Sequence, residues 1–227
     1  MKALIVLAHP EPASLNAALT HVAVQTLRET GQGVEVSDLC AQGFHAVAGR
    51  DDFVHLRNPE RLGYVHEQRH AAATRAYAPD ILVEQDKLAA ADLVIFQFPL
   101  WWYGVPAILK GWADRVLTHG FAYTDERLFE RGLLAGKQAM LSITTGGTEE
   151  ELEADSQHTG TVEQFLKPFG GGVLGFVGMT VLPPFIAYAA GSRDTAGRAA
   201  LLAAWRERLL LVVQQMPGDT SGPGGTP

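Results

Sequence analysis

Side chains able to hold a ligand gather in three short loops, and the first of them begins at His9. The segment from His9 to Ser14 follows an apolar run and contains two prolines, and Asn16 comes two residues later. A helix that starts at such a loop leaves backbone N–H groups unpaired, and its dipole favours an anion at that end. The segment therefore predicts a phosphate site to which His9, Ser14 and Asn16 add donors. An ordinary capped helix beside a solvated histidine is the alternative.

The second loop, from Pro99 to Pro106, offers apolar surface. Its two prolines and Gly104 fix a sharp path, and large apolar side chains lie between them: Leu100, Trp101, Trp102 and Tyr103. A flat apolar wall with backbone groups beside it suits a planar ring system. The alternative is a hydrophobic loop that a neighbouring element buries.

The third loop, Thr144-Thr145-Gly146-Gly147, combines hydroxyls with glycines and follows the apolar run from Gln138 to Ile143. Glycine lets a backbone approach a ring closely, and hydroxyl and N–H groups donate hydrogen bonds to the polar edge of such a ring. A turn that binds nothing would have a similar composition. This is, however, the third loop of a suitable kind to follow a predicted strand.

These loops belong to an alternation of predicted strands and helices. Short, nearly all-apolar runs are typical of parallel strands buried on both faces, and apolar residues three or four apart indicate helices. The helix after the first loop has Ser14 as its predicted cap and Gly31 as its stop, and another helix follows Pro106. The predicted strands are Lys2 to Ala8, Val34 to Val36 with its flanks, Asp92 to Phe98, Gln138 to Ile143 and Val173 to Leu182; the other predicted helices are Ile81 to Ala91, a run ending at Leu166, and Ala199 to Gln214.

This alternation predicts an α/β fold: a flavodoxin-like, doubly wound, five-stranded parallel sheet in the order 2-1-3-4-5, with helices on both faces. We expect residues 1–215 to form one domain and residues 216–227, rich in Pro, Gly, Ser and Thr, to be a disordered tail. The polar stretch from Leu39 to Tyr77 is weakly patterned. We interpret it as an excursion with one or two short helices that takes part in subunit contacts.

Composition excludes several classes of function. The net charge of −7 is opposite to the basic face that a nucleic-acid binder needs. A single cysteine, Cys40, allows no intrachain disulfide, and no apolar run is long enough for a signal peptide or a membrane span. We therefore expect a cytoplasmic protein without membrane insertion.

Other motifs predict no further site. Four scattered histidines lack the spacing of metal ligands and are expected to be solvated, so no metal site is predicted: His45, His55, His66 and His70. The segment from Gly170 to Gly175 matches the pattern GxGxxG, but it follows a predicted helix and precedes a predicted strand. Dinucleotide binding requires the reverse context, so we interpret this segment as a connection. The sequence has neither a P-loop nor a GxSxG motif.

Four stretches together resemble the NAD(P)H:quinone oxidoreductase family, the DT-diaphorase group of flavodoxin-like flavoproteins. They are His9 through Asn16, Ala90 through Trp112, Phe121-Ala122-Tyr123-Thr124, and Leu141 through Gly147. The resemblance extends over residues 2 to about 210. It implies a homodimer with flavin bound at the interface, and transfer of a hydride from NAD(P)H to the flavin and then to a quinone.

The resemblance also assigns residues to the cofactor. It implies that the flavin phosphates and ribityl chain are held by His9, Ser14, Leu15, Asn16 and Ala18. It also implies that the isoalloxazine ring is lined by Pro99, Leu100, Trp101, Trp102 and Tyr103. The residues that it implies for the polar edge of the ring are Thr144, Thr145, Gly146 and Gly147. Arg198 matches a family position that reaches the adenine end across the dimer. FAD is therefore the expected cofactor, and FMN is the alternative.

The family has a tyrosine and a histidine after the two glycines, which handle charge or protons as the flavin is reduced. His158 fills the histidine position in this chain, whereas Leu152 stands at the tyrosine position. Either His158 acts alone, or another group such as Tyr123 compensates. Asp125 stands where longer animal members of the family carry an aromatic residue over the substrate pocket. The resemblance therefore does not identify the electron acceptor of this chain.

These patterns predict an NAD(P)H dehydrogenase (quinone), which reduces quinones or similar planar acceptors by two electrons. Donor and acceptor would occupy one pocket in turn. The alternative is a flavin-bearing regulatory or electron-carrier subunit, such as an ancillary protein of a potassium efflux system. The loop that carries His158 favours the enzyme, because small carriers lack it.

Overall fold

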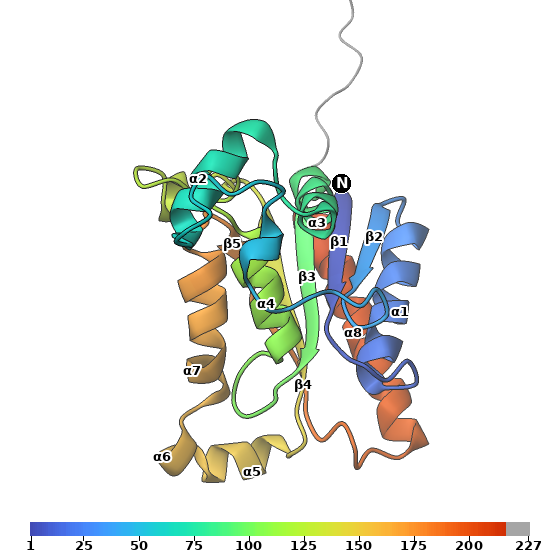
Figure 1. Cartoon of the computed structure of the whole chain (residues 1–227). Coiled ribbons are helices and arrows are strands. Elements are labelled where there is room, and N and C mark those ends of the chain that lie inside the picture. The colour runs from blue at the N-terminus through green and yellow to red at the C-terminus, as the bar shows by residue number, and fades with distance from the viewer. Residues whose placement is uncertain (217–227) are drawn as a thin grey trace, which may run out of the picture.

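The computed structural model describes residues 1–216 and shows a parallel sheet between two layers of helices (Figure 1). Neighbouring strands follow the order β2-β1-β3-β4-β5, and β6 also pairs with β4, so the predicted α/β class and strand order are confirmed. The predicted tail lies outside the described residues except for Met216. The strands are β1 Lys2–Leu7, β2 Gly33–Asp38, β3 Leu93–Pro99, β4 Gln138–Thr144, β5 Thr180–Val181 and β6 Phe185–Ala187.

Helices occupy most of the predicted positions. The α-helices are α1 Leu15–Glu29, α2 Tyr64–Thr74, α3 Pro79–Ala90, α4 Ala107–Val116, α5 Glu149–Ala154, α6 Ser156–Thr159, α7 Val162–Lys167 and α8 Thr195–Gln215. Short 3₁₀ turns lie at Arg50–Asp52 and Phe129–Arg131, and a π-helix spans Pro168–Leu174. Within residues 1–216, none of these helices combines the length and apolar character that crossing a membrane requires.

Alternate strand residues fill two separate cores, because successive side chains of a strand point to opposite faces of the sheet. Val6 and Phe96 are buried under α3, α4 and α7, whereas Ile5 and Ile95 are buried under α1 and α8 (Figure 1). On the second face the indole N–H of Trp205 in α8 donates to a backbone oxygen in α1, at 3.0 Å. The two helices on this face are therefore held together as well as against the sheet.

The predicted fifth strand, Val173 to Leu182, is wrong over most of its length. Val173 belongs to the π-helix, and only Thr180–Val181 pairs with β4 before the chain reaches Pro183 and Pro184. Proline cannot donate to a strand ladder, so two consecutive prolines interrupt the pairing. It resumes at β6, which pairs with the carboxyl half of β4. The predicted strand is thus reduced to β5, and β6 lies beyond its predicted end.

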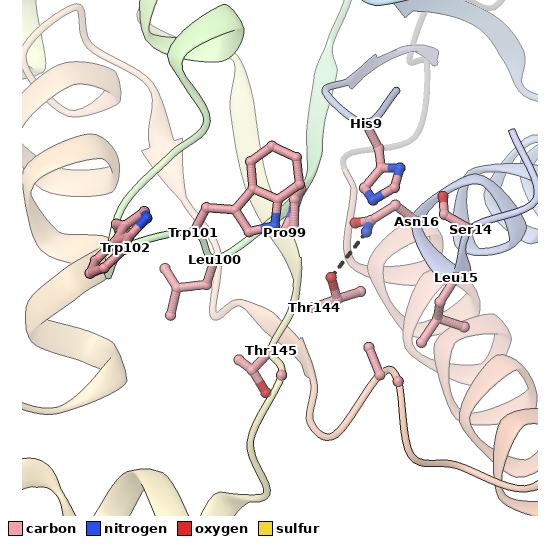
Figure 2. A pocket seen from close by; sticks show the side chains of 13 residues that line it. His9, Ser14, Leu15, Asn16, Pro99, Leu100, Trp101, Trp102, Thr144 and Thr145 are labelled. Carbon is pink, nitrogen blue, oxygen red and sulfur yellow. Dashed lines mark hydrogen bonds between the residues drawn. The ribbon is translucent and has the colours of Figure 1, made fainter. Parts of the chain in front are cut away.

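The carboxyl ends of β1, β3 and β4 meet at one edge of the sheet, at the bottom of Figure 1, and Figure 2 shows the side chains gathered there. The loops that leave these ends are the three that the sequence singles out. At the end of the first loop, the Ser14 hydroxyl accepts the backbone N–H of Ala17 at 3.1 Å, so the predicted cap of α1 is confirmed. The cap determines where α1 begins relative to this edge.

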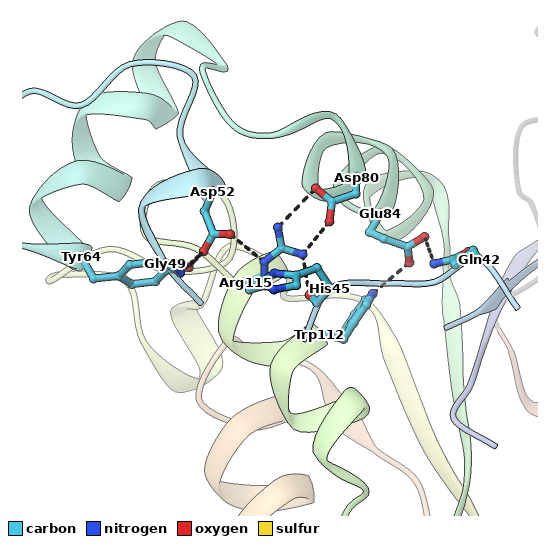
Figure 3. A network of polar contacts seen from close by, with 9 residues as sticks. All are labelled: Gln42, His45, Gly49, Asp52, Tyr64, Asp80, Glu84, Trp112 and Arg115. Atoms are coloured by element: carbon cyan, nitrogen blue, oxygen red, sulfur yellow. Dashed lines mark hydrogen bonds and ion pairs between the residues drawn. The ribbon is translucent and has the colours of Figure 1, made fainter. Parts of the chain in front are cut away.

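The excursion between β2 and α3 crosses α4 closely. A Cβ atom placed on Gly111 would lie 2.0 Å from the carbonyl oxygen of Ala46, so only glycine fits at this crossing. Next to it, the buried Arg115 guanidinium pairs with Asp52 at 2.7 Å and Asp80 at 2.5 Å (Figure 3). It also donates to the backbone oxygen of His45 at 2.7 Å. One side chain of α4 therefore joins the excursion to α3.

A second buried charge, Glu84 of α3, joins α3 to α4 and β2. Its carboxylate accepts the indole N–H of Trp112 at 2.9 Å, the hydroxyl of Ser37 at 2.9 Å and the ammonium group of Lys87 at 2.7 Å. Trp112 is fully buried and packs edge-on against Phe96 of the central strand. A buried carboxylate is tolerated when it is paired and hydrogen-bonded in this way.

We predict that Arg115→Met lowers the free energy of unfolding by about 3 kcal/mol or more. The substitution leaves the buried Asp52 carboxylate without a cation, which typically costs about 3–5 kcal/mol. Lys110→Met is the matched control, because Lys110 makes an exposed ion pair with Asp114 on the same helix. Such pairs contribute about 0–1 kcal/mol. Urea unfolding of both variants provides the measurement, and equal losses would show that the buried network does not stabilise the fold.

Candidate functional site

A cavity of about 680 Å³ lies at the edge of the sheet where the three loops meet (Figure 2). Its lining comes from the ends of β1, β3, β4 and β6 and from the start of α1. The residues that line it are His9, Ser14, Leu15, Asn16, Pro99, Leu100, Trp101, Trp102, Thr144, Thr145, Gly146, Ala190 and Gly191. Eleven of these were singled out from the sequence, and the structure brings them to one place.

The α1 end of the cavity is rich in hydrogen-bond donors. The first N–H groups of a helix have no partner within the helix. The Ser14 hydroxyl accepts the N–H of Ala17, and the Ser14 carbonyl oxygen accepts the N–H of Ala18. The N–H groups of Leu15 and Asn16 therefore remain available to a ligand. The α1 helix dipole adds partial positive charge at the same point. This end of the cavity is therefore suited to an anion.

His9 is fixed beside these donors. Its Nδ1 accepts the backbone N–H of Glu11 at 3.0 Å, so in the neutral imidazole the proton is on Nε2. The indole ring of Trp101 lies against the imidazole with 5.9 Å between the ring centres. His9 thus offers a donor whose orientation is set by the loop that carries it.

The Trp101-to-Gly104 turn presents the aromatic wall of the cavity in a costly backbone conformation. Trp102 and Tyr103 both have positive φ, 49° and 58°, and the N–H of Gly104 donates to the oxygen of Trp101 at 3.0 Å. Two left-handed central residues are typical of a turn that prefers Asn-Gly. Each such bulky residue costs about 1–3 kcal/mol. Trp102 is 94% exposed, so nothing within the described chain offsets this cost at its side chain.

The Thr144-to-Gly147 loop is held by the segment that follows β6. The backbone N–H of Thr145 donates to the oxygen of Ala187, and the backbone oxygen of Thr145 accepts the N–H of Ala190. The backbone oxygen of Gly147 accepts the N–H of Ala189. The Thr145 hydroxyl donates to the oxygen of Gly147 at 2.8 Å. Ala190 and Gly191 reach the lining in this way. Sequence reasoning missed both, and the only signal was that small side chains follow the last predicted strand.

Other predicted residues lie outside the lining. Ala18 lies one turn into α1, Gly147 is held by Ala189, and Tyr103 packs against Phe165 with 4.8 Å between ring centres. Arg198 is half-buried in the first turn of α8. His158 is exposed on α6, and its imidazole has no hydrogen-bond partner among residues 1–216. The predicted roles of these residues stay predictions.

Tyr123 lines a second cavity, of about 360 Å³, away from the first. Phe176 packs edge-on against its ring, and burial raises the pKa of the Tyr123 phenol, which is therefore neutral. Near this cavity Arg69 pairs with Asp125 at 2.6 Å, and His119 packs edge-on against Tyr123. Among the described residues, His158 lines neither this cavity nor the first one.

The first cavity suits a flavin by size and by the chemistry of its wall. Pockets for ligands of this size are commonly about 300–1,000 Å³. Anion-binding donors lie at the α1 end, the aromatic turn forms one wall, and hydroxyl and backbone groups from Thr144 to Gly146 complete the lining. A phosphate, a planar ring and the polar edge of that ring require these three kinds of surface.

Comparisons with known proteins agree with this fold. The model of a family described as having a flavodoxin-like fold matches residues 1–209. The chain is 46% identical to ribosyldihydronicotinamide dehydrogenase [quinone] of Pongo abelii, over 95% of this chain and 94% of that protein. It is 43% identical to NAD(P)H dehydrogenase [quinone] 1 of Cavia porcellus, over 95% of this chain and 78% of that protein.

A solved structure gives the same result. A candidate quinone reductase from Klebsiella pneumoniae superimposes with a TM-score of 0.88 at 38% identity, covering 96% of this chain and 90% of that one. Similarity of this extent, together with the matched family model, identifies the family. The chain belongs to the NAD(P)H:quinone oxidoreductase family of flavodoxin-like proteins.

Proposed function

We propose that the protein uses a flavin held in the 680 Å³ cavity to reduce quinones or similar planar acceptors by two electrons, with NAD(P)H as donor. The observation that carries the proposal is the convergence of helix N–H groups, an aromatic wall and a polar loop on one cavity. A bound flavin supplies the redox chemistry, since it takes a hydride from NAD(P)H and delivers one to the acceptor. No observation favours the alternative of a carrier subunit.

The roles of the residues follow from their positions. The N–H groups of Leu15 and Asn16, with His9, would bind the phosphate end. Leu100, Trp101 and Trp102 would pack along the ring, and the Thr144-to-Gly146 loop would donate to its polar edge. Ala18, Tyr103, Gly147 and Arg198 are proposed as further contacts, and Arg198 is the reason for proposing FAD over FMN.

We also propose that residues 1–215 act as one flavin-binding domain within a cytoplasmic homodimer. Support for the homodimer comes from the fully exposed Trp102 side chain and from the apolar second cavity around Tyr123 and Phe176. Both are surfaces that a second copy would cover. Tyr123 would then reach a flavin only across the dimer, and its neutral phenol would serve there as a hydrogen-bond donor. Sedimentation of the flavin-loaded protein tests the assembly, and a mass of one chain contradicts it.

Release and mass identification of the cofactor test the proposal directly. We expect the purified protein to carry FAD, and anaerobic titration with NADH or NADPH should bleach its absorbance. FMN as the only flavin would overturn the role of Arg198 but leave the reaction intact. A colourless protein that takes up neither flavin would overturn the proposed function.

Trp102→Ala is expected to weaken flavin binding by at least tenfold while the fold is retained. The indole supplies a large planar surface whose burial against a ligand contributes on the order of 2 kcal/mol. The side chain is 94% exposed without a ligand, so its removal leaves no void in the core. Flavin retention during dialysis measures the effect. Phe129→Ala is a matched control, because Phe129 is also an exposed aromatic residue with positive φ but lies outside the cavity.

His158→Ala is expected to slow reduction of the bound flavin about 100-fold and to preserve flavin content. Negative charge develops near the cofactor during hydride transfer, and one positioned donor or acid is typically worth about 10²–10⁴ in rate. We expect an effect at the lower end of this range because Leu152 stands where the family has its tyrosine. Stopped-flow reduction across pH provides the measurement. Equal rates for the variant and the parent at every pH would show that His158 has no catalytic role. The Thr145-to-Gly147 loop alone would then stabilise the developing charge.

A further inference from the structure

Gln97 is a buried amide in a strand whose other side chains are apolar. It lies on the central strand β3, two residues before the aromatic loop, and is 1% exposed. It does not line the 680 Å³ cavity. Its backbone already forms the strand ladder with Leu7 and Ser142, so the side chain is not needed for the pairing. An apolar residue would fill this position at lower desolvation cost.

The side chain of Gln97 begins a chain of hydrogen bonds that ends at the cavity wall. Its Nε2 donates to Oδ1 of Asn16 at 2.9 Å, and Nδ2 of Asn16 donates to Oγ1 of Thr144 at 3.0 Å (Figure 2 shows the second bond). Asn16 and Thr144 are also buried, at 3% and 4% exposure, and both line the cavity. The chain thus connects β3, α1 and β4 beneath the proposed flavin site.

The bond to Asn16 is the only one that the Gln97 side chain makes within residues 1–216. Its Oε1 atom is buried and has no partner there. A buried acceptor without a partner costs stability. The Gln97 side chain thus places an unsatisfied atom in the core, and its bond to Asn16 is the one contribution that the described residues show for it.

We propose that Gln97 is a positioning residue that makes the cavity wall a hydrogen-bond donor. This rests on the proposed function, since the group that accepts these hydrogen bonds is the bound flavin. Because Oδ1 of Asn16 is occupied by Gln97, the Asn16 amide must present its N–H₂ group to Thr144. Because Oγ1 of Thr144 then accepts, its own proton is directed elsewhere, toward acceptor atoms in the cavity. Gln97 acts through its neighbours without touching the ligand.

The opposite direction of the hydrogen-bond chain would present different groups to the cavity. If both amides were reversed, Oε1 of Gln97 would accept from Asn16, and the Thr144 hydroxyl would donate inward to Oδ1 of Asn16. In the observed direction the Gln97 amide leaves its oxygen and one N–H bond unpaired within residues 1–216, whereas the reversal would leave both N–H bonds unpaired. It would also remove the Thr144 proton from the cavity. The observed direction is the one that serves a ligand rich in acceptors.

Two substitutions at position 97 test the direction of the chain. Gln97→Met keeps similar volume and removes the donor, and we expect apoprotein to bind FAD about tenfold more weakly without loss of thermal stability. Gln97→Glu donates only when its carboxyl group is protonated, and ionisation turns it into an acceptor. Its FAD affinity should therefore fall as the pH rises from 6 to 9, with a slope that the parent protein lacks.

Gln85 provides the matched control. It is a buried amide on α3, under the opposite face of the sheet, and donates to Val116 and Thr118. Gln85→Met and Gln85→Glu should reduce thermal stability but leave FAD affinity and its pH profile unchanged. A second readout needs no flavin: hydrogen exchange of the Asn16 side-chain amide, followed by NMR, should be slow in the parent protein and faster in Gln97→Met.

The outcomes separate this inference from the function on which it depends. FAD affinity of Gln97→Met within twofold of the parent, together with a flat pH profile for Gln97→Glu, would overturn the positioning role and leave the flavin site intact. Unchanged exchange of the Asn16 amide in Gln97→Met would overturn it as well. A parent protein that binds neither FAD nor FMN would overturn both proposals.

Discussion

The pairing of β3 with β1 on one side and β4 on the other is the constraint on which the site depends. The ladder continues one residue beyond each strand, since the N–H of Ala8 donates to the oxygen of Gln97 at 2.9 Å, and that of Leu100 donates to Thr144 at 2.8 Å. The three loops therefore leave the sheet at the same level. A shift of one residue in either pairing would also exchange the two buried faces of β3, so the cores enforce this register.

The rigid sheet contrasts with the aromatic turn that it carries. Trp102 and Tyr103 are both left-handed, yet the chain buries neither side chain. Strain of this kind persists only when surrounding structure or a ligand determines it. The strand end at Pro99 and the helix start after Pro106 hold the two ends of the turn, and a ring packed on Trp102 would offset its cost. Stability and binding are therefore linked at this loop.

Sequence patterns predicted the parts of the fold that depend on local signals. Buried strands read as apolar runs, and Ser14 marked the start of α1 because capping is a local interaction. The predicted strand from Val173 to Leu182 was wrong over its first part because its apolar residues fit a buried helical turn equally well, and Val173 and Leu174 belong to the π-helix. Gly111 and Arg115 carry no local signal, since their roles depend on the excursion that crosses α4.

Local sequence signals also predicted only part of the site. The three loops could be recognised from their composition, and their convergence followed from the parallel order of the strands. Ala190 and Gly191 enter the lining through backbone pairing with the Thr144-to-Gly147 loop, a contact that local sequence does not encode. His158 and Tyr123 were assigned by resemblance, and one chain does not place them together. Among residues 1–216, Tyr123 lines the second cavity and not the first, so its proposed role depends on a second copy of the chain.

The buried polar groups fall into two kinds, and the difference bears on function. Arg115 and Glu84 lie on the face of the sheet that α3, α4 and α7 cover, and each joins several elements through two or more hydrogen bonds. Their networks are explained by the elements that they hold together. Within residues 1–216 the Gln97 side chain makes one bond and leaves its oxygen unpaired, although an apolar side chain would suit β3. Since the fold gains little from it, the purpose of this amide is found at the other end of the chain that it begins, in the cavity wall formed by Asn16 and Thr144.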